Sequence, residues 1–184
     1  MRLSVKSIIR KRLRRTRPDV HKGDFGRVFI IAGSRGLTGA CRLASAAALK
    51  AGAGLVTVGA PKSLAKILTR DSREAMWILL PETVSGAVSL KSLDRASSFL
   101  KHEDVLAIGP GLSRHPSTLS FVRALTKQSR KPMVIDADAI IAFQGQSRLL
   151  KRLKAPSVLT PHPGEFHRVF GMSPVIETDR IKAA

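Results

Sequence analysis

The sequence predicts an α/β protein in which a mainly parallel sheet is flanked by helices, and two observations support this fold class. Short apolar runs such as 28–32 and 105–108 are continuous rather than alternating, which is typical of strands buried on both faces. These runs alternate with longer helical stretches, and that order predicts parallel strands joined by right-handed crossovers. With 184 residues, the chain can form one such domain with a substantial core.

The expected elements follow one another as strand and helix. Strands are expected at 28–32, 55–58, 76–80, 105–108 and 133–135, with a further short buried strand from Ser157. Helices are expected at 40–51, 63–68, 90–100 and 117–127, the last with Ser117 as its N-cap. Pro163 can begin another helix because its missing N–H is no loss there, and Gly171 can end it. One more helix is expected to begin near Glu177.

Two glycine-rich connections follow predicted strands. The segment 33–39, with Gly33 and Gly36, comes directly after the first strand, and Gly109-Pro110-Gly111 comes directly after the fourth. Their backbone N–H groups could bind a phosphate or another anion. The glycine spacing matches neither the dinucleotide fingerprint nor the Walker A motif, and a tight turn with positive φ explains 33–39 equally well.

Polar side chains follow the fifth and sixth strands. Asp136 and Asp138 could orient a hydroxyl group, hold a hydrated metal or cap a helix. Asp136 is the better functional candidate, because Asp138 fits a capping role equally well.

A turn of Pro161, His162 and Pro163 then leads to Glu165 in the first turn of a helix, near the positive end of its dipole. A single Pro-His-Pro turn is more often structural than chemical. However, all these loops leave strands at one edge of the sheet, which predicts a ligand site with phosphate character.

The formal net charge is +19, and much of it lies in a basic arm at residues 1–20, ahead of a domain at 21–184. The arm's first seventeen residues contain no acid and carry Arg2, Lys6, Arg10, Lys11, Arg12, Arg14, Arg15 and Arg17. The arm could bind RNA, an anionic membrane surface or an acidic partner, or it could be a targeting peptide. A solvated arm remains the simplest interpretation, and the lack of aromatic residues weakens the case for a nucleic-acid platform.

The single cysteine, Cys41, excludes an internal disulfide framework and predicts a reducing compartment, so we expect a cytoplasmic location. No apolar run approaches the roughly 20 residues that a membrane-spanning helix needs. We therefore expect no membrane partner, and a homo-oligomer is compatible with the sequence.

Five segments together resemble a known family. The segments are 21–27, 33–58, 109–112, 134–139 and 159–166. In content and order they resemble the ADP- or ATP-dependent NAD(P)H-hydrate dehydratases, which have a ribokinase-like, doubly wound fold. The resemblance implies repair of the (6S) hydrate of NADH or NADPH by phosphorylation of the added hydroxyl group and elimination of phosphate.

The resemblance also implies roles for particular residues. Ala40, Gly111 and His162 would line the site for the hydrated dinucleotide, and Glu165 would help to position Mg²⁺ with the phosphates of ADP or ATP. Further candidates for the site are Lys22, Asp24, Gly33, Gly36, Gly109, Asp136 and Asp138.

The family's catalytic aspartate, in a Gly-Asp helix start, and its Lys-Gly nucleotide segment have no counterpart in this sequence. The resemblance therefore implies a C-terminally incomplete fold, and the catalytic residue stays unknown. We expect the 184-residue chain alone to be inactive, and to be marginally folded because an apolar edge and face lie uncovered.

Two alternatives from different classes remain open. A ribokinase-like small-molecule kinase would share the phosphoryl transfer, but the Thr-Pro-His-Pro-Gly-Glu turn together with Asp-Ala-Asp favours the dehydratase. A nucleic-acid-binding protein is suggested by the charge of +19 but disfavoured by the absence of a known RNA-reading motif.

Overall fold

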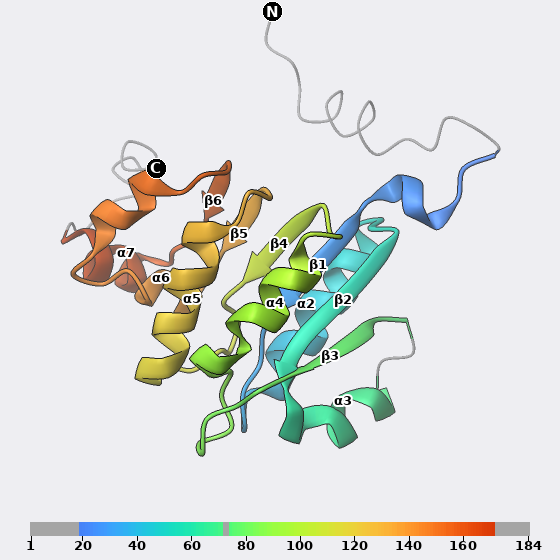
Figure 1. The fold of residues 1–184 in the computed structure, drawn as a ribbon, viewed down its shortest axis with the longest axis horizontal. Coiled ribbons are helices and arrows are strands. Elements are labelled where there is room, and N and C mark those ends of the chain that lie inside the picture. Colours follow the sequence, from blue (N-terminus) through green and yellow to red (C-terminus); the bar gives the residue numbers. More distant parts are fainter. Residues whose placement is uncertain (1–18, 72–73, 172–184) are drawn as a thin grey trace, which may run out of the picture.

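Six parallel strands form one sheet in the computed structural model, which describes residues 19–71 and 74–171 (Figure 1). The strands are β1 (Arg27–Ile31), β2 (Leu55–Pro61), β3 (Met76–Leu80), β4 (Val105–Ile108), β5 (Met133–Ile135) and β6 (Ser157–Leu159). Their order is β3-β2-β1-β4-β5-β6, and every neighbouring pair is parallel. The predicted doubly wound sheet is confirmed, and its strand order reverses between β1 and β4, where such sheets bind ligands.

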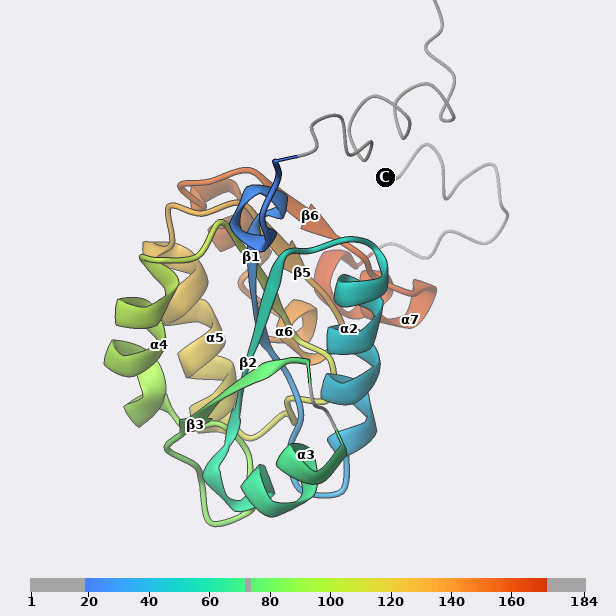
Figure 2. The same ribbon diagram turned by 90° about the vertical axis from the view of Figure 1, so that its right-hand side faces the viewer.

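Helices cover both faces of this sheet. The α-helices are α2 (Thr38–Lys50), α3 (Ala65–Asp71), α4 (Leu93–Leu100), α5 (Pro116–Gln128), α6 (Asp138–Ile141) and α7 (Pro163–Phe170). Short 3₁₀ helices are η1 (Lys22–Phe25), η2 (Lys62–Leu64), η3 (Leu90–Ser92) and η4 (Ser147–Arg152). Figure 2 shows α4 and α5 on one side of the sheet and α2 on the other. Among the described residues, no helix is long and apolar enough to cross a membrane.

Alternate residues of β1 enter two separate cores, because successive side chains of a strand point to opposite faces. Phe29 and Ile31 are fully buried in the core beneath α4, α5 and α6. Ile30 is buried in the second core, against Cys41 of α2. The small side chains of α2 let its backbone lie close to β1 and β2, as its sequence predicts.

Two predictions about individual elements are wrong. Ser117 is not the N-cap of α5: Pro116 takes the first helical position, and the Nδ1 atom of His115 accepts the hydrogen bond from the Ser117 N–H. The last strand is not buried, because β6 lies at the edge of the described sheet and its Val158 is 60% exposed. The helix expected near Glu177 lies outside the described residues.

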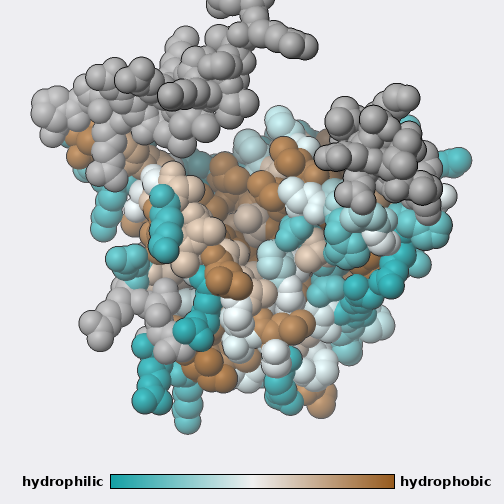
Figure 3. All heavy atoms as spheres, turned by 180° about the vertical axis from the view of Figure 1, so that it is seen from behind, coloured by the Kyte–Doolittle hydropathy of each residue, from teal (hydrophilic) through white to brown (hydrophobic). Residues whose placement is uncertain are grey.

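One stretch of the sheet on the α2 side lacks a covering helix in the described part of the chain. Val134 of β5 and Val158 of β6 are direct partners in the register, and they are 36% and 60% exposed. Figure 3 shows hydrophobic surface gathered near the centre of the side opposite α4 and α5. Here α2 covers β1 and β2 but does not reach the last two strands.

Candidate functional site

The loops that follow β1 and β4 are bonded to each other at the carboxyl edge of the sheet, which is where the strands end. The Gly33 N–H donates to the Pro110 carbonyl oxygen over 2.9 Å. The Ser34 hydroxyl donates to the Gly111 carbonyl oxygen over 2.8 Å. These two bonds hold together the loops on either side of the point where the strand order reverses.

Gly111 and Ala40, two predicted substrate-binding residues, lie in direct contact. A Cβ atom on Gly111 would lie 2.8 Å from the Ala40 Cβ, and Gly111 has a φ of +65°. Ala40 is in the first turn of α2, so the backbone of the β4 loop lies against the start of that helix. Larger side chains at either position would separate the two segments.

Cys41 lies beneath this contact and is not a reactive group. Its side chain is fully buried, and its thiol donates to the Thr38 carbonyl oxygen. Burial raises the pKa of the Cys41 thiol above its ordinary value, which disfavours the thiolate. The thiol therefore packs against Gly33 rather than serving as a nucleophile.

Gly109, in the loop after β4, packs against the loop after β5 and so brings that loop to the same junction. Its φ is +138°, and a Cβ atom there would lie 1.7 Å from the Asp136 carbonyl oxygen. The Gly109 N–H donates to the Ile31 carbonyl oxygen over 3.1 Å. Gly36, in contrast, has open space around the position of a Cβ atom. Glycine is favoured there only by the positive φ of the turn, which is +84°.

The two aspartates after β5 hold neighbouring loops in place. Asp136 Oδ1 accepts a hydrogen bond of 2.6 Å from the Thr160 hydroxyl in the loop after β6. Asp138 accepts from the Ser113 N–H at 3.0 Å and from Arg114 Nε at 3.1 Å, both in the loop after β4. Neither aspartate caps α6, whose N-cap is Ala137.

His162 and Glu165 form a reciprocal cap at the start of α7. The His162 Nδ1 accepts from the Gly164 and Glu165 N–H groups at 3.0 Å and 3.4 Å. The Glu165 carboxylate accepts from the His162 N–H at 3.0 Å and lies 3.2 Å from its Nε2. Both ring nitrogens are therefore engaged, although the His162 side chain is 65% exposed and Glu165 only 8%.

Comparison with known proteins identifies the family. The family model described as NAD(P)H-hydrate dehydratase matches residues 28–184. This chain belongs to the NAD(P)H-hydrate dehydratase family. The ribokinase-like fold and the family predicted from the sequence are thus confirmed.

Curated relatives of the chain support the same family assignment. The chain is 46% identical over its whole length to a bifunctional NAD(P)H-hydrate repair enzyme of Moorella thermoacetica, and spans 35% of that protein. It is 38% identical, over 94% of its length, to the bifunctional repair enzyme of Escherichia coli, and spans 30% of it. The chain therefore spans about a third of the length of these curated relatives.

Two solved structures have the same fold. The ADP/ATP-dependent NAD(P)H-hydrate dehydratase of Bacillus subtilis, co-crystallized with ATP/Mg²⁺, is 26% identical, with a TM-score of 0.68 over 90% of this chain and 54% of that one. A ribokinase-like superfamily protein from Enterococcus faecalis is 25% identical, with a TM-score of 0.74 over 92% of this chain and 57% of that one.

The magnesium site that the dehydratase family implies is not formed by the described residues alone. Within 19–71 and 74–171, no group of three or more His, Cys, Asp or Glu side chains is placed to hold a metal ion. Glu165 is buried, and both its oxygens already face His162. Mg²⁺ commonly takes one or two carboxylates plus substrate phosphates, so Glu165 would first have to leave its cap.

Two of the predicted site residues are not brought to the carboxyl edge. Lys22 and Asp24 lie in η1, directly before β1, and the Lys22 carbonyl oxygen packs on Gly54 at the start of β2. Asp24 accepts a hydrogen bond from the His21 N–H. The structure therefore places both at the amino edge, where the strands begin, opposite the other candidates.

Sequence reasoning missed three residues of this candidate site. Ser34 and Thr160 bond adjacent loops together, and Arg114 places a half-exposed guanidinium group beside Asp138. Thr160 stands two positions before His162, so the Thr-Pro-His pattern could have drawn attention to it. Arg114 gives no comparable signal, because one arginine among many in a basic chain is not distinctive.

Proposed function

We propose that this chain supplies the substrate-binding part of an ADP- or ATP-dependent dehydratase for the (6S) hydrate of NADH or NADPH. The observation that carries the proposal is the junction of the Gly33 and Gly111 loops at the switch point of the sheet. A dinucleotide carries two phosphates and two sugars, and residues without large side chains let it approach such a junction closely.

The roles proposed for individual residues follow from their surroundings. Ala40 and Gly111 provide a surface without large side chains, against which the hydrated nicotinamide end would lie. His162 would contribute the exposed face of its imidazole ring, since both ring nitrogens already have partners within the α7 cap. Asp136, held by Thr160, is a fixed carboxylate at the same edge that could accept a hydrogen bond from a hydroxyl group.

ADP or ATP and Mg²⁺ are proposed for the whole protein because the similar Bacillus subtilis enzyme was co-crystallized with ATP/Mg²⁺. Bound to a nucleotide, Mg²⁺ would neutralise charge on the transferred phosphate. The residues described above bind and orient the hydrate, and the group that removes the proton from its hydroxyl is not identified among them.

Calorimetric titration of the 184-residue chain with NADPH hydrate tests the proposal. Ala40→Leu should weaken binding by tenfold or more, because the larger side chain would push the Gly111 loop away from α2. Ala47→Leu, at an exposed position of the same helix, is the matched control and should bind like the wild type. Equal affinity of the two variants would contradict the assigned site.

A second pair of variants separates the capping role of His162 from its role in binding. His162→Asn keeps a side-chain acceptor for the N–H groups of α7, since Asn is a good N-cap. We expect this variant to keep its melting temperature and to lose about tenfold in affinity, about 1.4 kcal/mol. Unchanged affinity would show that His162 is only a cap.

A further inference from the structure

Cationic side chains line the amino edge of the sheet along four neighbouring strands, most densely before β5 and β6. The segments 19–26, 101–104, 129–132 and 151–156 lead into β1, β4, β5 and β6, which are adjacent in that order. Their cationic residues are Lys22, Lys101, Arg130, Lys131, Lys151, Arg152 and Lys154. All but Lys131 are exposed, and Lys131 is half-buried.

Acidic residues offset the cations of the first two segments but not those of the last two. Asp19 and Asp24 share a segment with Lys22, and Glu103 and Asp104 share one with Lys101, whereas 129–132 and 151–156 contain no acid. Asp24 and Asp104 accept hydrogen bonds from the backbone N–H groups of His21 and Arg27, and Glu103 is 5% exposed. The sequence 105–135 contains no acid at all. Among the residues that the structure describes, none of the lysines and arginines of this edge forms a salt bridge.

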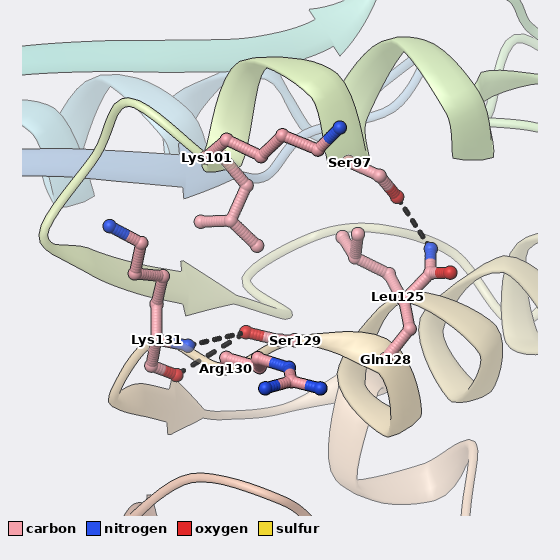
Figure 4. Close-up of a pocket in the computed structure, with 8 residues that line it drawn as sticks. Ser97, Lys101, Leu125, Gln128, Ser129, Arg130 and Lys131 are labelled. Carbon is pink, nitrogen blue, oxygen red and sulfur yellow. Dashed lines mark hydrogen bonds between the residues drawn. The ribbon is translucent and has the colours of Figure 1, made fainter.

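A groove opens in the middle of the edge, between the ends of α4 and α5. Its volume is about 360 Å³, its floor contains Leu100 and Leu125, and its rim carries Lys101, Arg130 and Lys131 (Figure 4). The Gln128 amide donates to the Ser97 hydroxyl and bridges the two helices. The three cations come from two loops, so the groove joins the positive charge of the β4 segment to that of the β5 segment.

The geometry points to an extended polyanion, and we propose that this amino edge binds single-stranded RNA through its phosphates. Adjacent strands are about 4.8 Å apart, so the cations before β5 and β6, together with Lys101 before β4, spread positive charge over about 10 Å. That length suits consecutive phosphates of an extended strand better than a single compact anion. Asp19, the first residue that the structure describes, leads into β1 at this edge, and the sequence before it is rich in basic residues.

RNA fits this edge better than a membrane or an acidic protein does. Large hydrophobic residues that are exposed lie elsewhere in the described chain, so the four segments offer no apolar anchor for a bilayer or a protein interface. These segments also contain few aromatic residues, with Phe25 the one example. The amino edge would therefore contact the phosphates of the RNA and not its bases.

Fluorescence anisotropy of the full chain with a labelled oligouridylate tests the proposal at several KCl concentrations. The edge variant is Lys101→Gln, Arg130→Gln and Lys131→Gln. The matched control is Lys62→Gln, Lys66→Gln and Arg70→Gln, which removes the same charge from exposed positions at η2 and α3. Each phosphate contact should contribute about 0.7 to the slope of log affinity against log salt.

We expect the edge variant to lose at least tenfold in affinity and about 2 in that slope, and the control to lose less than threefold. Melting temperatures of both variants should match the wild type, which excludes misfolding as the cause. Equal losses in the two variants would show that only net charge matters and would overturn the proposal.

Three further measurements distinguish other sources of binding. If deletion of residues 1–17 abolishes RNA binding while the edge variant of the full chain binds like the wild type, the arm alone binds RNA and the edge does not. Polyglutamate that displaces RNA at equal charge would indicate an acidic protein partner instead. Binding to anionic vesicles in the absence of RNA binding would indicate a membrane surface.

Discussion

Glu103 is the residue whose surroundings conflict most with its charge. It lies between α4 and β4, is 5% exposed, and its Oε2 lacks a hydrogen-bond partner within the described structure. Burial raises the pKa of the Glu103 carboxyl above its ordinary value, and this outweighs the opposing attraction of Arg27, His102 and Lys131. Folding therefore shifts this carboxyl towards its protonated form.

This raised pKa has a defined effect on stability. Below the ordinary pKa the carboxyl is neutral in both states. As pH rises above that value the unfolded state loses its proton first, so stability falls, and the loss is complete once pH has passed the folded-state pKa. Glu103→Gln should therefore raise the free energy of unfolding at pH 8 by about 1 kcal/mol, with a gain that vanishes near pH 4. Thermal melts across this range measure it, and exposed Glu74→Gln is the control. A gain that is independent of pH would contradict the assignment.

Among the elements, the loop after β4 depends most strongly on one small residue. Gly109→Ala would place a methyl group 1.7 Å from the Asp136 carbonyl oxygen at a φ of +138°. We expect a loss of about 3 kcal/mol or more, because both backbones would have to move. Gly39→Ala, in α2 with no atom near its Cβ position, should be neutral or stabilising by up to about 1 kcal/mol.

Urea unfolding of the two glycine variants measures the difference. Loss of stability in Gly109→Ala together with unchanged Gly39→Ala would support a tight junction between the loops after β4 and β5. Similar stability in both variants would mean that these loops can separate at little cost, and that the candidate site is not rigid.

Local sequence patterns predicted the elements well where one strong signal acts alone. Continuous apolar runs identified β1, β3 and β4, and Pro163 and Gly171 gave the ends of α7. Ser117 failed because Pro116 and His115 compete for the same helix start. Neighbouring candidates for one role cannot be ranked from residue type alone.

The site was predictable as a place but not as a set of contacts. The sequence shows that Gly33, Gly109, Asp136 and His162 follow strands, and parallel topology then brings their loops to one edge. It cannot show that Asp138 would accept a hydrogen bond from the Ser113 N–H, because that contact depends on how the loop after β4 lies against the start of α6. Lys22 and Asp24 were assigned through motif resemblance, and their position before β1 places them at the other edge.

At the scale of the whole molecule, the apolar patch on β5 and β6 should govern solubility. Val158→Thr keeps a β-branched side chain in the strand but makes its exposed face polar. We expect the variant to self-associate less than the wild type in sedimentation experiments at rising protein concentration. Val84→Thr is the matched control, because Val84 is 99% exposed but lies in a loop away from the patch.

Equal self-association of the wild type and both valine variants would show that this patch is not the cause. The open edge of β6 would then be the next surface to examine, since an unpaired strand edge can pair with another chain.

The central position of β1 also constrains how the chain can fold during synthesis. Its two neighbours are β2, which follows soon after, and β4, which follows only after β2, β3 and three α-helices. A ribosome-bound chain that ends before Ile108 can assemble β3, β2 and β1, but one side of β1 must then remain unpaired with Phe29 and Ile31 uncovered. The strand that organises the finished sheet is thus the one most exposed to misassembly while the sheet is being made.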